Sequence, residues 1–203
     1  MPNALEAIRF SPSDCDYFLL ANSANCQTAP PLRRQSGWPI RVGVGPSSYN
    51  VDVGHGRMYG GTLWIDCFPG KLPAFMRGLG LEVEARDISL NRSSTQVNVR
   101  QDTAAAGPIY AWQHWENLHP YAKFLYGQGS MDFPPHGASY LHDTRSLWAV
   151  GGGFDYRFHG PFWARLDYEH QKWQQLFGYY TPRPQGFTLG VAYDFSYLRS
   201  PRQ

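Results

Sequence analysis

GGGFDYRFHGPFWARLDYEHQKW (residues 151–173) and GFTLGVAYDF (residues 186–195) are the stretches that decide the fold. Apolar and polar residues alternate through both, which is the period expected of β-strands with one apolar and one polar face. HGP at 159–161 joins two of the alternating runs as a hairpin turn would. The two stretches therefore predict three consecutive antiparallel strands.

Alternation alone permits two arrangements of such strands. In a soluble barrel of lipocalin type the apolar face encloses a small apolar ligand, whereas in a transmembrane barrel it meets lipid and the charges lie in the lumen. The soluble alternative predicts an apolar pocket lined by residues such as Leu81, Leu166, Leu189 and Val191.

The last strand favours the membrane arrangement. Its residues fit the pattern polar-x-Gly-apolar-x-aromatic-x-aromatic at Thr188, Gly190, Val191, Tyr193 and Phe195. This pattern resembles the C-terminal assembly signal of bacterial outer-membrane β-barrel proteins, which implies barrel-insertion machinery as a partner. Many such barrels end on the aromatic residue, whereas here eight residues follow it.

The segment after residue 151 resembles the last three strands of the small eight-stranded barrels related to outer-membrane protein A. The resemblance implies an all-β fold, an eight-stranded antiparallel up-and-down transmembrane β-barrel over residues 39–197, placed in the cell outer membrane and surrounded by its lipid. It also implies a structural or surface-interaction role through the loops, whose ligand the sequence does not identify. We expect a monomer.

Composition agrees with one barrel domain. The chain has 203 residues, of which 16% are aromatic and 17% charged, and no apolar run approaches the roughly 18 residues of a spanning helix. A net charge of +2 and the lack of a nucleic-acid motif argue against a nucleic-acid partner. Cys15, Cys26 and Cys67 form no CxxC pair, so no zinc site or other cofactor is expected, and a bridge between the first two stays open.

The chain ends lie outside the expected barrel. Residues 1–38 form an N-terminal segment in which Tyr17–Ala24 is the only candidate signal core, and Asp14 and Asp16 stand where basic residues should precede it. We therefore expect a wrongly placed start or a degenerate signal, followed by a linker at 28–37. Residues 198–203 form a C-terminal tail.

Eight strands are expected, at 39–53, 59–68, 78–88, 103–115, 121–133, from about 144, from 162 and at 187–195. Residues 89–102 are expected to form a long mobile loop or a strand extension, and Pro108 a bulge or local break. The side that Trp64 faces is ambiguous. The tightest turns are expected after strands two, four and six, with both chain ends at that rim, in the periplasm.

Charged residues on the inner faces are expected to form an ion-pair network that plugs the lumen, because an unpaired buried charge is costly. The network comprises Glu82, Glu84, Arg86, Lys123, Asp155, Arg157, Arg165, Asp167 and Glu169. The less favoured alternative for these residues is a narrow ion channel.

No catalysis is expected. His136 and His142 lie near Ser139 and Asp143, as a lipid A-modifying enzyme or a metal site would require, but loop composition gives such neighbours by chance. The glycines at 151–153 lie inside a strand pattern and are no phosphate loop. Aromatic residues near strand ends predict interfacial girdles, at Trp38, Trp115, Trp163, Trp173, Tyr179 and Tyr180.

Overall fold

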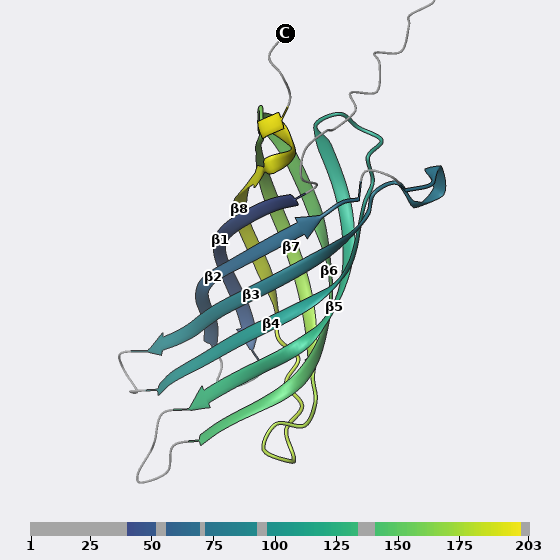
Figure 1. The fold of residues 1–203 in the computed structure, drawn as a ribbon. Helices are drawn as coiled ribbons and strands as arrows, with labels where there is room; N and C mark the ends of the chain where they lie inside the picture. Colours follow the sequence, from purple (N-terminus) through teal and green to yellow (C-terminus); the bar gives the residue numbers. More distant parts are fainter. Residues whose placement is uncertain (1–39, 52–55, 70–71, 93–96, 134–140, 200–203) are drawn as a thin grey trace, which may run out of the picture. The chain divides into compact units, whose positions relative to one another are not determined.

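The computed structural model describes residues 40–51, 56–69, 72–92, 97–133 and 141–199, all within one compact unit, Gln35–Gln203. These residues form a closed antiparallel barrel in which each strand pairs with the next and β8 with β1 (Figure 1). The strands are β1 (Ile40–Val51), β2 (Gly56–Cys67), β3 (Leu79–Arg92), β4 (Val97–Ala111), β5 (Leu118–Phe133), β6 (Leu141–His159), β7 (Phe162–Trp173) and β8 (Gln185–Asp194). No helix in the described ranges is long and apolar enough to cross a membrane.

The apolar and polar faces are sorted as the membrane arrangement requires. Leu81, Leu189 and Val191 point outward, with 61%, 61% and 54% of their surface exposed, while Glu82 and Asp155 are buried inside. The interior of the barrel therefore holds charge and not an apolar ligand pocket, and the lipocalin-like alternative is wrong.

Trp64, whose facing was ambiguous, lies inside the barrel and is 1% exposed. Glycines on β1 and β8 make room for its indole: a Cβ at Gly43 would overlap the ring, and one at Gly190 would lie 2.5 Å from it. Two small residues thus admit one large one, as close packing requires.

Residues 89–102 are mostly a strand extension. β3 continues to Arg92 and β4 begins at Val97, and their ladder runs without a register change from Leu79 opposite Tyr110 to Arg92 opposite Val97. Pro108 faces outward and causes the expected local break in the ladder, but no bulge. The pairing with β5 omits residues 107 and 108 and then resumes in the same register, because proline removes only its own ladder donor.

The expected difference in connection length between the two rims is wrong. The connection after β2, residues 68–78 with the 3-10 helix η2 (Ala74–Met76), is as long as residues 174–184 after β7, although 160–161 after β6 is short. Strand length differs instead. β3 to β6 have 14 to 19 residues and the other four have 10 to 12.

The outer surface carries an apolar band that ends before the long strands do. On β6 the outward positions are apolar from Trp148 to Phe158, and Thr144 and His142 beyond them are polar. A rise of about 3.4 Å per residue and a tilt of about 40° give this stretch a height of roughly 26 Å, close to the lipid-facing band of outer-membrane barrels.

Beyond the band, on the side of the β1–β2, β3–β4, β5–β6 and β7–β8 connections, the polarity inverts. We call this part the rim section. Most of its outward positions are polar, including Asn50, Arg57, Asp87, Ser89, Arg100, Gln128, His142, Thr144 and Lys172, and Tyr59 opposite Ser89 is an exposed aromatic exception. Its interior is an apolar cluster of Tyr49, Val51, Met58, Ile88, Val99, Leu125, Met131, Leu147, Ala149, Trp173 and Leu176. The rim section thus has the polarity of a water-soluble barrel.

The aromatic positions are only partly as expected. Trp163 and Trp173 are 3% and 1% exposed and belong to the interior, because they share the strand face that carries Arg165 and Glu169. Tyr179 is exposed in the β7–β8 connection, and Trp115 in the β4–β5 turn. Trp38, Cys15 and Cys26 lie outside the described residues, and Cys67 carries a free thiol.

Candidate functional site

Lys123 on β5 is the centre of one half of the lumen network. Its Nζ lies 2.9 Å from Glu82, 2.7 Å from Glu84, 3.0 Å from Asp167 and 3.2 Å from Glu169, measured to carboxylate oxygens. All five side chains are buried, so each charge depends on its partners and not on water.

Gly151 provides the space in which Lys123 lies. It is opposite Lys123 in the β5–β6 ladder, and a Cβ at this position would lie 2.9 Å from Cε of the lysine. Gly151, the first glycine of the run, is therefore part of the lumen packing.

Arg165 on β7 is the centre of the other half. It donates hydrogen bonds of 2.6 Å to Asp66, 2.8 Å to Glu82 and 2.8 Å to Asp155. Because Glu82 also accepts from Lys123, it joins the two halves. Arg165 uses its Nε and both terminal nitrogens, which anchors three strands with one side chain.

Arg86 and Arg41 complete the network. Arg86 pairs with Glu84 and lies 2.8 Å from Glu169, and Arg41 lies 2.7 Å from Asp155. Arg41 and Asp66 were missing from the set expected from sequence, although both alternate with outward apolar neighbours. They face each other in the β1–β2 ladder, a relation that only the register reveals.

Arg157 does not join the network, so its expected place in the network is wrong. It lies at the end of β6, beside the register shift between residues 157 and 159, and donates to the side chain of Asn117 in the β4–β5 turn. Its guanidinium is 5.7 Å from the ring of Trp163. Its position on the inner face was predicted correctly, but its level along the barrel places it at the rim opposite the rim section.

The carboxylates of Glu84, Asp167 and Glu169 lie close enough together for a metal ion. Lys123 Nζ is within 3.2 Å of all three, so an ammonium group already holds the position of the cation. Within the described residues this cluster is an ion-pair site.

Apolar side chains close the lumen on both sides of the network. At the end near Arg157, the guanidinium of Arg41 lies 4.1 Å from the ring centroid of Trp163. At the rim section, Trp173 and Leu176 are 1% and 0% exposed within the apolar cluster. The charged network is therefore enclosed between aromatic and aliphatic layers.

The residues considered for catalysis or metal binding do not assemble. His142 points outward from β6 toward Asp132, whereas Asp143 points the other way and accepts hydrogen bonds from Arg145 and the Phe177 backbone. Adjacent strand residues face opposite sides, so these two cannot form one site. His136 and Ser139 lie outside the described residues.

The C-terminal pattern is divided between the two faces. Thr188 and Gly190 are buried, while Val191 is exposed and Tyr193 lies against Phe195 with ring centroids 4.9 Å apart. β8 ends at Asp194, and the aromatic begins the 3-10 helix η3 (Phe195–Arg199).

Comparison with known proteins identifies a family for most of the chain. A family model described as an outer membrane protein beta-barrel domain matches residues 18–195. No curated protein sequence matches the chain.

Solved structures resemble the barrel at low sequence identity. Neisserial surface protein A (NspA) has a TM-score of 0.61 at 12% identity, covering 77% of this chain and 96% of its own. Ail, the attachment invasion locus protein of Yersinia pestis, has a TM-score of 0.55 at 18% identity, and the match covers 77% of this chain and 97% of Ail. OprG from Pseudomonas aeruginosa has a TM-score of 0.50 at 10% identity, and the match covers 77% of this chain and 95% of OprG. At these identities the likeness concerns the fold.

Proposed function

Because this chain belongs to the outer-membrane β-barrel family and is an outer-membrane protein, we propose that it is a non-catalytic, monomeric barrel that presents its rim section to partners outside the cell. The observation that carries this proposal is the inversion of polarity beyond the apolar band. A polar exterior over an apolar core is a folded surface built for water and not for lipid.

The orientation follows from the layout of such barrels. The first and last described strands begin and end at the rim opposite the rim section, with Ile40 and Asp194 near it. Bacterial barrels keep their chain ends in the periplasm. The rim section then faces the cell exterior, which fits the names of two similar structures, a surface protein and an attachment invasion protein.

The filled lumen supports a plug and not a conducting path. Eight strands enclose a space that side chains just fill, and here ion pairs and aromatic layers occupy it. We expect no discrete conductance steps from the purified protein in planar bilayers. Steps that persist after repeated purification would favour the narrow ion channel.

Impermeant maleimide labelling in intact cells tests the orientation. Cysteines are placed one at a time at Thr144, on the rim section, and at Phe75, 81% exposed at the opposite rim, in a chain whose own cysteines are replaced by serine. The Thr144 position should label in intact cells and the Phe75 position only after the outer membrane is permeabilised. The reverse pattern would refute the proposed surface role.

Assembly would involve the barrel-insertion machinery, reading the last strand. The outward Val191, Tyr193 and Phe195 support this part of the proposal, because a partner has access to them along the barrel wall.

A further inference from the structure

Two carboxylate oxygens of the lumen network have no hydrogen-bond donor in the described part of the chain. They are Oδ2 of Asp167 and Oε2 of Glu169, and both atoms are buried. The two residues are separated by one position on β7, so their side chains lie on the same inner face. A buried acceptor without a donor costs free energy, so these two oxygens are expected to have one.

Lys123 does not supply the missing donors. Its Nζ lies 3.0 Å from Asp167 Oδ2 and 3.2 Å from Glu169 Oε2, but its hydrogen bonds go to Glu82 and Glu84. An ammonium group has three N–H bonds, and four carboxylates surround this one. At most one N–H is therefore left for the two remaining oxygens.

The first oxygen of each carboxyl group is already bonded. The hydroxyl group of Tyr121 donates to Asp167 Oδ1 over 2.6 Å. Arg86 and Gln171 each donate to Glu169 Oε1 over 2.8 Å. Each carboxyl group is thus fixed through one oxygen, while the other oxygen remains unbonded among the described residues.

The charges around these oxygens do not balance. Glu84, Asp167 and Glu169 have carboxylate oxygens that all lie within 4.8 Å of one another. Two cations contact this cluster, Lys123 and Arg86. Three ionised carboxylates against two cations would leave one uncompensated negative charge in a buried place, where such a charge is costly.

Uncharged groups face the cluster from the neighbouring strands. They are Tyr49 and Thr62 beside Arg86, Tyr121 and Thr188 beside Asp167, Gly151 opposite Glu169, and Gln101 and Gln171 toward the rim section. The other charged partner of Lys123 is Glu82, which is itself an acid. Beyond it, Arg165 already donates to Glu82 and to two acids of the other half. These neighbours supply no further positive charge to the cluster.

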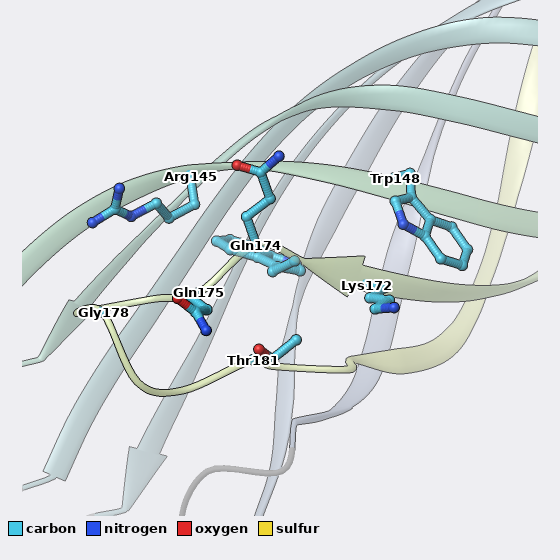
Figure 2. A pocket seen from close by; sticks show the side chains of 8 residues that line it. Arg145, Trp148, Lys172, Gln174, Gln175, Gly178 and Thr181 are labelled. Atoms are coloured by element: carbon cyan, nitrogen blue, oxygen red, sulfur yellow. The ribbon is translucent and has the colours of Figure 1, made fainter.

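Trp173 separates the cluster from water at the rim section. Its Nε1 donates over 3.0 Å to Gln171, which in turn donates to Glu169. The same indole lines the hollow beside the β7–β8 connection that Figure 2 shows, and no acid is among the residues that line this hollow. Because Trp173 is buried, the hollow ends at its side chain and the carboxylates lie behind it.

We propose that the folded barrel retains one proton between Asp167 and Glu169, and that the two carboxyl groups share it. The proton is bonded to one of the two unbonded oxygens and is donated to the other. It supplies the missing donor and makes the cluster neutral. Carboxylates held this close together without water do not all ionise, and such pairs share a proton. The proposal concerns the interior and does not depend on the surface role of the rim section.

A retained proton makes the stability of the barrel depend on pH. In the unfolded chain both carboxyl groups are in water and ionised at neutral pH. The unfolded state then binds fewer protons than the folded state, so the folded state loses stability as the pH rises. Each unit of pH should raise the unfolding equilibrium constant by about tenfold, until the proton leaves the folded protein.

Infrared spectroscopy of the full chain tests the proposal directly. The protein is folded in an alkyl glycoside detergent, which has no carbonyl group. A protonated carboxyl group has a C=O absorption above the amide band, which a carboxylate lacks. We expect this absorption in the folded protein at neutral pH and its weakening in Glu169→Gln. Its absence from the unsubstituted protein, or full intensity in the variant, would overturn the proposal.

Urea unfolding in lipid vesicles between about pH 5 and pH 8 gives an independent count of protons. The unfolding constant of the unsubstituted protein should rise with pH about tenfold more per unit than that of Glu169→Gln. Glu116→Gln, an exposed acid in the β4–β5 turn, is the matched control and should keep the full pH dependence and the full infrared absorption. Equal slopes in all three proteins would overturn the proposal. So would a stability that depends on sodium, since a metal cation would then take the place of the proton.

Discussion

The ammonium group of Lys123 donates a hydrogen bond of 2.7 Å to a carboxylate oxygen of Glu84 inside the barrel. The lysine is on β5 and the glutamate on β3, with β4 between them, so the bond bridges over β4 on the inner wall and is not a contact within one ladder. It ties together strands that have no backbone hydrogen bonds to each other. The lumen network therefore adds cross-links to the barrel that the sheet itself lacks.

Replacing the central cation should be severely destabilising. Lys123→Met leaves four buried carboxylates without their shared partner, and breaking a buried pair in this way costs about 3–5 kcal/mol. Urea unfolding in lipid vesicles, followed by tryptophan fluorescence, measures the change. Arg157→Met is the control, since its partners lie at an exposed rim, and it should cost under about 1 kcal/mol. Equal losses in the two variants would show that the network does not stabilise the barrel.

Neutralising one carboxylate of the network should lower the unfolding free energy much less than removing Lys123. Among the described residues the network contains six carboxylates (Asp66, Glu82, Glu84, Asp155, Asp167 and Glu169) and four bases (Arg41, Arg86, Lys123 and Arg165). Glu84→Gln keeps an oxygen that accepts hydrogen bonds and reduces the surplus of negative charge. We expect a loss under about 2 kcal/mol in the same unfolding assay. A loss as large as that of Lys123→Met would contradict the charge count.

A charge placed on the apolar band should destabilise the folded protein in lipid. Leu189 faces outward in the middle of β8, opposite Leu166 on β7, so Leu189→Arg should cost about 2–4 kcal/mol. Gln128→Arg, on the outward face beyond the band, should change the unfolding free energy by under about 0.5 kcal/mol. If both arginines cost the same, the band would be wrongly placed along the barrel.

The β7–β8 connection should respond to acid. The backbone N–H of Phe177 and the nearby Arg145 lower the pKa of the Asp143 carboxyl, which lies outside the apolar band. A lowered pKa means that the contact is stable above the ordinary aspartate range and is lost as the pH falls through the lowered value, below about pH 3.9. The NMR shift of the Phe177 amide should report this loss between neutral pH and pH 2. Asp143→Asn should abolish the pH dependence, and an unchanged profile in that variant would exclude the carboxyl as its cause.

The terminal aromatic should affect assembly more than stability. Phe195 is 39% exposed and follows the end of β8, so Phe195→Ala removes little packing. Insertion by reconstituted barrel-insertion machinery should be slowed, while spontaneous folding into vesicles should not. Phe162→Ala, a similarly exposed outward aromatic outside the C-terminal pattern, is the control. Equal slowing of both variants would show that the machinery does not read this position.

The sequence by itself determined the strands and the two faces of each. A period of two places Glu82, Glu84 and Arg86 together whatever the partners of β3 turn out to be, because successive side chains of a strand point to opposite sides. The family resemblance then decided that the charged face is the inner one. Eight of the nine residues expected in the lumen network belong to it, and the exception, Arg157, was placed on the correct face.

Only the tertiary structure decided at which level along the barrel each residue lies and which residues it meets. The register sets those levels, so it separates Arg157 from the network and brings Arg41 and Asp66 into it. For 89–102 the sequence left a loop and a strand extension open, and the pairing of 89–92 with 97–100 decides for the extension, because each strand supplies the hydrogen bonds that the other needs. The rim section could not be read from alternation, since the same period of two continues while the two faces exchange polarity. That exchange depends on where the surroundings change from lipid to water, a property of the assembled barrel and not of any single strand.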